Sequence, residues 1–230
     1  MNINIIKSKF SFENLNKFVA LLSALSTVAT GYFAYTTYSL SRTLALAQLS
    51  PNFYIASTFT SGDKEEITES IMIKNLNSNS SIFNYTSQVE SYLQVYTKNN
   101  SFIIPLKEYF IGKSNSSTNL AEVYYGFNYN HSIFYNFYDF LKENKEKCNL
   151  SVFLKTFVII TYTDSFGKDI SLFYDVSSSK FIEKYEYDKI KPSSSFPFIF
   201  IKDFQKEASY DNVLNQIDFF NPDSKIIKTN

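Results

Sequence analysis

The chain has 230 residues with 22 basic and 22 acidic side chains, so its formal net charge is zero. Lysine and arginine do not cluster as they do in nucleic-acid-binding proteins, and we expect no nucleic acid as a partner. With five glycines, one cysteine and one histidine, the sequence also excludes a glycine-rich phosphate loop, an internal disulfide and a zinc site.

Residues 1–17 form a short, mildly basic segment that contains Lys7, Lys9 and Lys17. Beyond the apolar stretch that follows, Arg42 stands alone as a nearby basic residue. Segments rich in lysine and arginine tend to stay in the cytoplasm. This bias predicts a cytoplasmic amino terminus and a carboxy-terminal domain outside the cytoplasm.

Residues 18–40 are predicted to form a transmembrane helix. This stretch carries no charged side chain, and as a helix it would reach roughly 35 Å, enough to cross a bilayer core of about 30 Å. Its Ser and Thr hydroxyls can bond backbone carbonyls one turn back, and its late tyrosines suit the headgroup boundary. A buried core helix and a cleaved signal peptide stay open as alternatives. The lipid bilayer is thus the first expected partner.

Small residues recur along one side of this span. Ser23, Thr27 and Gly31 are four residues apart and are candidates for helix–helix association, because small side chains let two helices approach closely. The alternative is that small residues are simply common in such spans. Residues 41–51 are expected to continue as a helical stalk that stops at Pro51, because proline cannot extend a helix.

Residues 52–203 are predicted to fold as a β-sandwich domain. Apolar and polar residues alternate with a period of two, and clusters of turn-forming residues separate the runs. Eight strands are expected, over residues 53–59, 66–74, 82–97, 101–110, 121–127, 151–162, 170–176 and 181–187. The fold class is therefore mainly β: an antiparallel β-sandwich with one inserted helix, preceded by a single amino-terminal transmembrane helix.

The inserted helix is predicted over residues 131–147, because four apolar residues share one of its faces. A second helix, over residues 205–219, lies in the carboxy-terminal segment 204–230 and also has an apolar face. We expect that face to pack on the domain rather than to dock a partner. The two faces consist of Phe134, Phe137, Tyr138 and Leu141, and of Tyr210, Val213, Leu214 and Ile217.

Residues 164–167 are predicted to form a hairpin turn. Asp164 can accept hydrogen bonds from backbone N–H groups two residues on, Gly167 can take a positive φ, and Phe166 can tuck under the turn. Turn chemistry explains these three residues better than a functional role does.

Three stretches together resemble a loose group of uncharacterised bacterial membrane proteins that have an amino-terminal transmembrane helix and a carboxy-terminal β-sandwich domain. They are Pro51-Asn52-Phe53, the run Ile73-Lys74-Asn75-Leu76-Asn77 with Ser81-Ile82-Phe83-Asn84, and Tyr162-Thr163-Asp164-Ser165-Phe166-Gly167. The second stretch lacks the glycine that the group often carries after its asparagine. Covering residues 18–176, the resemblance implies the layout of anchor and domain and implies no activity.

Side chains suited to catalysis are sparse. His131 is the only histidine, lies at a predicted helix start and has no partner that the sequence identifies. Cys148 is expected to be a small apolar residue entering a strand. Asp164, Asp169 and Asp175 would have to converge to hold calcium, but their spacing matches no loop motif. We therefore expect no catalytic residue, no cofactor and no metal site.

The leading hypothesis for function is a single-pass, membrane-anchored, non-enzymatic binding or assembly module that presents its β-sandwich domain to a protein partner or a ligand. Self-association through the transmembrane helix is a second way to assemble. One alternative is a membrane sensor-effector, similar to bacterial defence proteins, whose β domain controls a membrane-perturbing helix. The other is a hydrolase that uses the scattered carboxylates.

Overall fold

The structure is a computed structural model that describes residues 12–62, 66–80, 82–98, 100–116, 121–144, 150–191 and 198–220. The basic residues before position 12, the predicted loop at 192–195 and Cys148 lie outside the described residues. The chain divides into two compact units, Met1–Leu49 and Ser50–Asn230.

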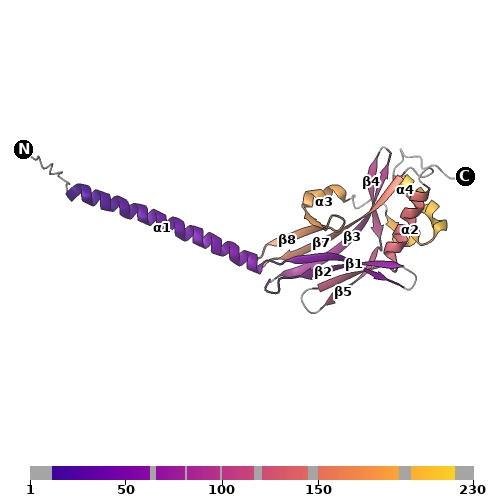
Figure 1. The fold of residues 1–230 in the computed structure, drawn as a ribbon, viewed down its shortest axis with the longest axis horizontal. Coiled ribbons are helices and arrows are strands. Elements are labelled where there is room, and N and C mark those ends of the chain that lie inside the picture. Colours follow the sequence, from indigo (N-terminus) through magenta and orange to yellow (C-terminus); the bar gives the residue numbers. More distant parts are fainter. Residues whose placement is uncertain are drawn as a thin grey trace, which may run out of the picture. The chain divides into compact units, whose positions relative to one another are not determined.

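The first unit contains one α-helix, α1 (Phe12–Leu49), drawn in indigo in Figure 1. An 18-residue apolar stretch within Asn14–Leu49 has a mean hydropathy of 1.5, and none of this stretch is buried in the structure. By length and composition, α1 can therefore cross a membrane. The Thr27 and Thr30 hydroxyls donate to the carbonyls of Ser23 and Ser26, at 2.9 and 2.8 Å. These polar side chains are thus satisfied inside the helix.

The helix α1 runs without a break through segments that the sequence predicted separately. The expected stalk continues the helix as far as Leu49, and the helix stops before Pro51. Upstream, residues 12–17 belong to the same helix, although we expected them in a separate basic segment. The boundary at residue 18 is therefore a change of composition and not of backbone structure.

The second unit contains two sheets (Figure 1). Sheet A has four antiparallel strands in the order β1 (Phe53–Ser61), β2 (Ile67–Asn75), β6 (Ala121–Gly126) and β5 (Phe110–Ser116). Sheet B has the order β10 (Ile199–Phe200), β4 (Ser101–Lys107), β3 (Phe83–Thr97), β7 (Leu150–Thr163), β8 (Asp169–Asp175) and β9 (Lys180–Ile182). All neighbours in sheet B are antiparallel except β10 and β4, which are parallel.

One hydrophobic core joins the two sheets. Side chains alternate between the two faces of a strand, so Ile71 and Ile73 of β2 point to the same side and are fully buried. They belong to one cluster with Val158 and Ile160 of β7 in sheet B. The predicted alternation along these strands therefore produces a mainly β domain after an apolar amino-terminal helix.

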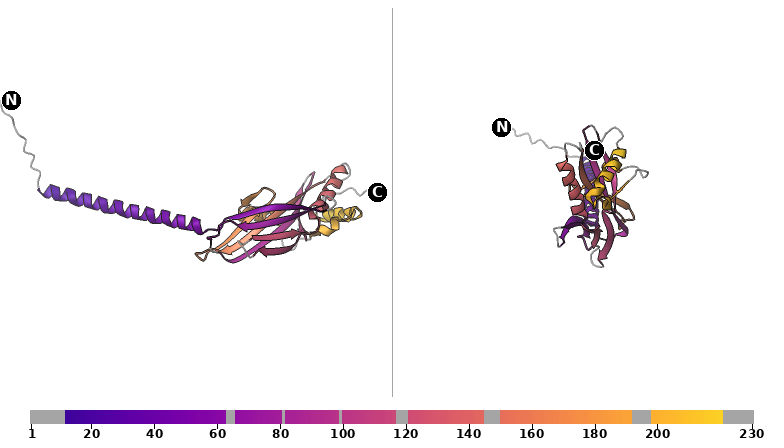
Figure 2. Two further views of the ribbon diagram at one scale, coloured as in Figure 1. Left: turned by 60° about the horizontal axis from the view of Figure 1, so that its bottom comes forward. Right: turned by 90° about the vertical axis from the view of Figure 1, so that its right-hand side faces the viewer.

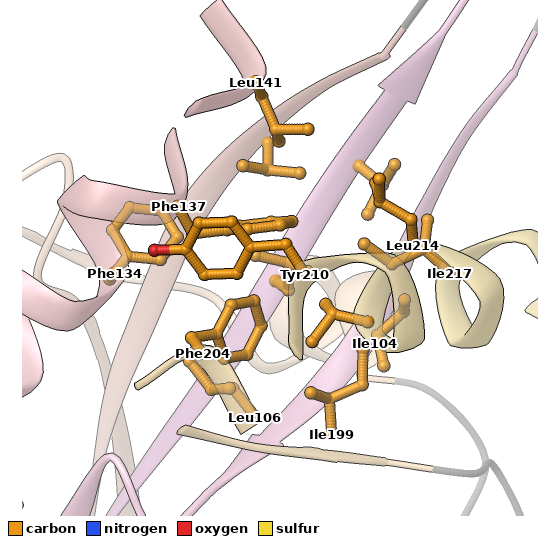
Figure 3. Packing of buried hydrophobic residues seen from close by; sticks show 14 of the residues in the cluster. Ile104, Leu106, Phe134, Phe137, Leu141, Ile199, Phe204, Tyr210, Leu214 and Ile217 are labelled. Atoms are coloured by element: carbon orange, nitrogen blue, oxygen red, sulfur yellow. The ribbon is translucent and has the colours of Figure 1, made fainter. Parts of the chain in front are cut away.

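A second core lies where sheet B is covered by helices α2 (Asn130–Glu143) and α4 (Tyr210–Phe220). Figure 2 shows both helices at the same end of the β domain. In Figure 3 the ring of Phe137 meets those of Phe204 and Tyr210, at centroid distances of 4.8 and 5.1 Å. The apolar face of the carboxy-terminal helix is buried in this cluster, as expected.

Three predicted elements differ in the structure. The strand expected over residues 101–110 ends at Lys107, because Glu108 takes a φ of 61° and turns the chain. The strand β5, apart from Phe110, then lies in the interval between the strands expected over residues 101–110 and 121–127. The sheets are mostly antiparallel, as predicted, except that β10 pairs in parallel with β4.

The strand predicted over residues 181–187 is mostly helical. After β9, the helix α3 (Lys184–Ile190) follows, preceded by a 3.3 Å hydrogen bond from the Glu183 N–H to the Glu186 carboxylate. Lys184 and Asp188 add an ion pair one turn apart. Among its described residues, the domain therefore holds a second α-helix between strands, where we expected a single inserted helix.

The hairpin at residues 164–167 has the predicted hydrogen bonds. The Asp164 carboxylate accepts from the N–H groups of Phe166 and Lys168, both at 2.9 Å, and Gly167 has a φ of 77°. Phe166 is 56% exposed, so the prediction that it tucks under the turn is wrong. The carboxylate bonds close this turn, and the Phe166 ring lies mostly exposed.

The outer face of sheet B carries a carboxylate that fixes α3. Glu90 of β3 accepts hydrogen bonds from the hydroxyls of Tyr92 and Tyr187, and the Lys191 ammonium lies 3.5 Å away. Burial alone would raise the pKa of Glu90, but the hydrogen bonds and the lysine outweigh it and lower the pKa below its usual value. The ionised carboxylate is thus part of the folded state.

We expect this arrangement to make the stability of the folded protein depend on pH in the acidic range. A lowered pKa in the folded state stabilises the protein above the pKa of the unfolded chain, about 4.3, and the effect is lost as the pH falls through the folded value. The urea midpoint of the wild type should therefore fall between pH 6 and pH 3 more steeply than that of Glu90→Gln. Asp188→Asn, in an exposed ion pair, is the control and should keep the wild-type slope. Equal slopes for all three proteins would contradict this role of Glu90.

Candidate functional site

A cavity of about 360 Å³ lies where the edge of sheet A, the first turns of α2 and the strand β7 meet. Aromatic side chains make much of its wall, from Phe59 of β1 and from Phe134, Tyr135 and Tyr138 of α2. Its volume lies in the range of small-molecule sites in proteins. This cavity is the candidate functional site.

The position of α2 at the cavity is set by Asn130, whose side chain is fully buried. Its amide oxygen accepts from the N–H groups of Glu69 and His131, both at 2.8 Å. Its amide nitrogen donates to the carbonyls of Tyr109 and Glu69, at 2.9 and 3.3 Å. One side chain therefore ties the start of α2 to β2 and to the turn after β4.

Two further hydrogen bonds support the same junction. The Tyr129 N–H donates to the Thr68 hydroxyl at 2.9 Å, and the Ser132 hydroxyl accepts from the Ile67 N–H at 2.7 Å. Tyr129 itself takes a φ of 59°, which turns the chain from β6 into the helix. These contacts fix which residues of α2 line the cavity, and His131 is the first of them.

Glu69 brings a buried carboxylate to the cavity wall and is 6% exposed. One oxygen accepts from the Ser57 hydroxyl at 2.9 Å, and the other accepts from the Tyr109 hydroxyl at 2.8 Å. Burial, and then the nearby Glu69 charge, raise the pKa of Tyr109 well above its usual value, so its hydroxyl stays a neutral donor. Two neutral hydroxyls therefore hold this carboxylate.

His131 is the nearest titratable nitrogen to Glu69 among the described residues, with 4.0 Å between Nδ1 and Oε2. The ring lies between Phe59 and Tyr135, at centroid distances of 4.9 and 4.5 Å. Burial lowers the pKa of His131, and the Glu69 charge opposes this only in part. The imidazole is thus neutral near pH 7, and its buried Nδ1 has no hydrogen-bond partner in the part of the chain that the structure describes.

These residues do not form a nucleophilic triad. In such a triad the histidine takes the proton from the serine and the acid orients the histidine. Here the Ser57 hydroxyl donates to Glu69 instead of His131. The arrangement suits binding of a polar group more than activation of Ser57.

A second carboxylate, Glu122 of β6, bridges the two sheets away from the cavity. It accepts hydrogen bonds from Tyr85, at 2.9 Å, and from Ser87, both on β3. The Lys113 ammonium pairs with it at 2.9 Å. This cluster is therefore internally neutralised and serves to hold sheet A against sheet B.

The other residues singled out from the sequence do not converge on the cavity. Asp169 accepts from the Thr163 hydroxyl beside the hairpin of Asp164, whereas Asp175 pairs with Lys155. Within the described ranges, no group of three acidic, histidine or cysteine residues could hold a metal ion. The residues Ser23, Thr27 and Gly31 lie on α1, and a Cβ on Gly31 would meet no atom within 4 Å in the structure.

Sequence reasoning missed Glu69 as a site residue, although the strand pattern contained a signal. In β2, Glu69 is two residues from Ile67 and from Ile71, so the period of two places its carboxylate on the same inner face as these isoleucines. An acidic residue at an inward position needs a buried partner or a ligand. Its contact with His131 spans the interval between β2 and α2 and needed the fold to be seen.

Comparison with protein-family models, curated proteins and solved structures finds no match for the chain. The features of the chain that bear on function are the cavity and the helix α1.

Proposed function

We propose that the chain is a single-pass, membrane-anchored binding module without enzymatic activity. In this proposal the helix α1 crosses the bilayer, and an antiparallel β-sandwich outside the cytoplasm presents the α2 cavity. The observation that carries the proposal is an aromatic cavity with one buried carboxylate, in a chain that also has a helix apolar enough to span a membrane.

Two structural features support the binding role. Inner faces of sheets A and B share one core, which gives the cavity rigid walls from both sheets. The polar groups at the cavity are held by neighbours that fix their geometry, such as Ser57 and Tyr109 on Glu69. Preorganised walls with a few fixed polar groups are typical of binding sites.

The anchoring role is tested by alkaline extraction of membranes from cells that make the full chain. We expect the protein to stay in the membrane pellet. The variant Leu25→Lys/Val28→Lys places two charges in the middle of the span, each costing about 3 kcal/mol of insertion free energy, and should appear in the soluble fraction. Leu44→Lys/Ala47→Lys, with the same spacing outside residues 18–40, should stay in the pellet. Release of the wild type by alkali would contradict anchoring.

The binding role is tested by mild detergent extraction followed by affinity capture of the full chain. We expect a partner or a small molecule to co-purify with the wild type and to be lost when the cavity is filled by Thr156→Phe, since Thr156 lines the cavity and is buried. Recovery of the wild-type protein alone, repeatedly and under mild conditions, would count against a binding module.

A further inference from the structure

The described part of the β domain buries three carboxylates, and they are not equivalent. Glu122 and Asp175 each have a lysine ammonium at 2.9 Å, from Lys113 and Lys155. Glu69, equally buried, has no lysine or arginine partner among the described residues and is held only by hydroxyl groups. Buried charges in proteins are usually paired with an opposite charge, and the described wall of the cavity beside Glu69 lacks the cation that the other two sites contain.

His131 lies beside Glu69 at the same cavity. Its Nδ1 is buried and lies 4.0 Å from the Glu69 Oε2, which is too long for a hydrogen bond. Because burial lowers the pKa of His131, its ring is neutral and supplies no cation to the carboxylate. Glu69 therefore lacks a charged partner among the described residues, and a positively charged donor from the cavity suits it best.

The aromatic wall of the cavity also suits a positively charged donor. Phe59, Tyr135 and Tyr138 line it, and aromatic faces attract cations as well as apolar groups. A metal ion would find one carboxylate and one imidazole there, fewer protein ligands than calcium or structural zinc sites use. An organic cation with an apolar body matches both the aromatic walls and the Glu69 carboxylate.

We propose that the cavity binds a small primary amine as its ammonium ion, with an N–H group donated to the Glu69 carboxylate and with the apolar body against Phe59 and Tyr135. This inference rests on the proposed binding function and names its ligand class. Glu69 supplies the charge, and the neutral His131 leaves that charge for the ligand to balance.

The test is calorimetric titration of the full chain in phosphatidylcholine nanodiscs with 2-phenylethylamine. The matched probes are 2-phenylethanol and 3-phenylpropionate, which keep the apolar body and change the charge. We expect the amine to bind at least about tenfold more tightly than the alcohol, and the carboxylate not to bind, because the charge-assisted bond to Glu69 is worth more than a neutral one. Equal binding of amine and alcohol, or no binding of the amine, would overturn the proposal.

Two variants locate the site. Glu69→Gln should weaken amine binding by about tenfold or more, whereas Glu122→Gln, the same change at the carboxylate that bridges the two sheets, should leave it unchanged. Phe59 lies directly opposite Glu69 in the β1–β2 register and is 55% exposed. Phe59→Lys therefore supplies a tethered ammonium at a tolerant position and should abolish amine binding while the far-ultraviolet circular dichroism stays that of the wild type.

The outcomes separate this inference from the proposed function. If the wild type, Glu69→Gln and Phe59→Lys bind the amine equally, the measured heat comes from binding outside the cavity, and the inference is overturned. A protein that stays in the membrane, captures a partner and ignores the amine would retain the proposed function and lose the ligand class. Release from the membrane with intact amine binding would keep the ligand class and contradict the membrane anchoring in the proposed function.

Discussion

Gly126→Ala is expected to destabilise the β domain by about 3 kcal/mol, the upper end of what overpacking in a core costs. A Cβ at position 126 would lie 2.2 Å from the Glu69 carbonyl oxygen and 2.4 Å from the Asn130 amide nitrogen. Neither neighbour can move freely, because the Asn130 side chain is bonded to the backbone of Glu69. The methyl group would therefore force β6 away from β2 or break the junction with α2.

The control for this variant is Gly112→Ala in the neighbouring strand β5. A Cβ at Gly112 would meet no atom within 4 Å, and its φ is not in the left-handed region. Its unfolding free energy should stay within about 1 kcal/mol of the wild type. Urea denaturation of the full chain in detergent micelles, followed by circular dichroism, measures both. Equal midpoints for the two variants would show that Gly126 is not packed as described.

Asn130→Ala is expected to cost about 4 kcal/mol, because the substitution leaves up to three buried backbone groups without their partner, and each costs about 1–3 kcal/mol before relaxation. Those groups are the N–H of Glu69 and His131 and the carbonyl of Glu69. The Tyr109 carbonyl keeps a hydrogen bond from the Phe127 N–H at 2.9 Å. The loss also frees the start of α2, so His131 should lose its fixed place between Phe59 and Tyr135.

Two measurements separate the effect on stability from the effect on position. Urea denaturation gives the free energy, with Asn144→Ala as the control, since Asn144 makes a single side-chain bond to the Phe140 carbonyl at the end of α2. The ring signals of His131, the only histidine, report its aromatic neighbours by nuclear magnetic resonance. We expect these signals to shift towards solvent-exposed values in Asn130→Ala and to keep their wild-type positions in Asn144→Ala. An unchanged histidine spectrum in both would contradict the positioning role of Asn130.

Much of the fold follows from local pattern. The period of two predicted the strands that became β1, β2, β3, β6, β7 and β8, and the apolar faces predicted α2 and α4 to within a few residues. Where the prediction was wrong, a local feature competed with alternation. Glu108 left the strand because its backbone took a positive φ, and the tyrosines of α3 alternate like strand residues although Tyr187 is buried as part of a helix.

The candidate site was less predictable, because its residues come together only through the fold. Glu69 and His131 lie on a strand and a helix that are far apart in sequence, and no short motif connects them. The helix start at His131 was predictable from the apolar face of α2, and the inward position of Glu69 from the alternation in β2. That these two meet depends on the register between β1, β2 and β6 and on the bonds of Asn130.

The central claim, a β domain anchored in a membrane and displayed outside the cytoplasm, is tested most directly by protease accessibility. Protease is added to intact cells that make the full chain, to cells with a permeabilised outer layer, and to lysates. We predict that residues 52–220 are digested before lysis, in intact or permeabilised cells, while a cytoplasmic control protein stays whole. Protection of the β domain until lysis would place it in the cytoplasm and contradict the orientation on which the proposed function rests.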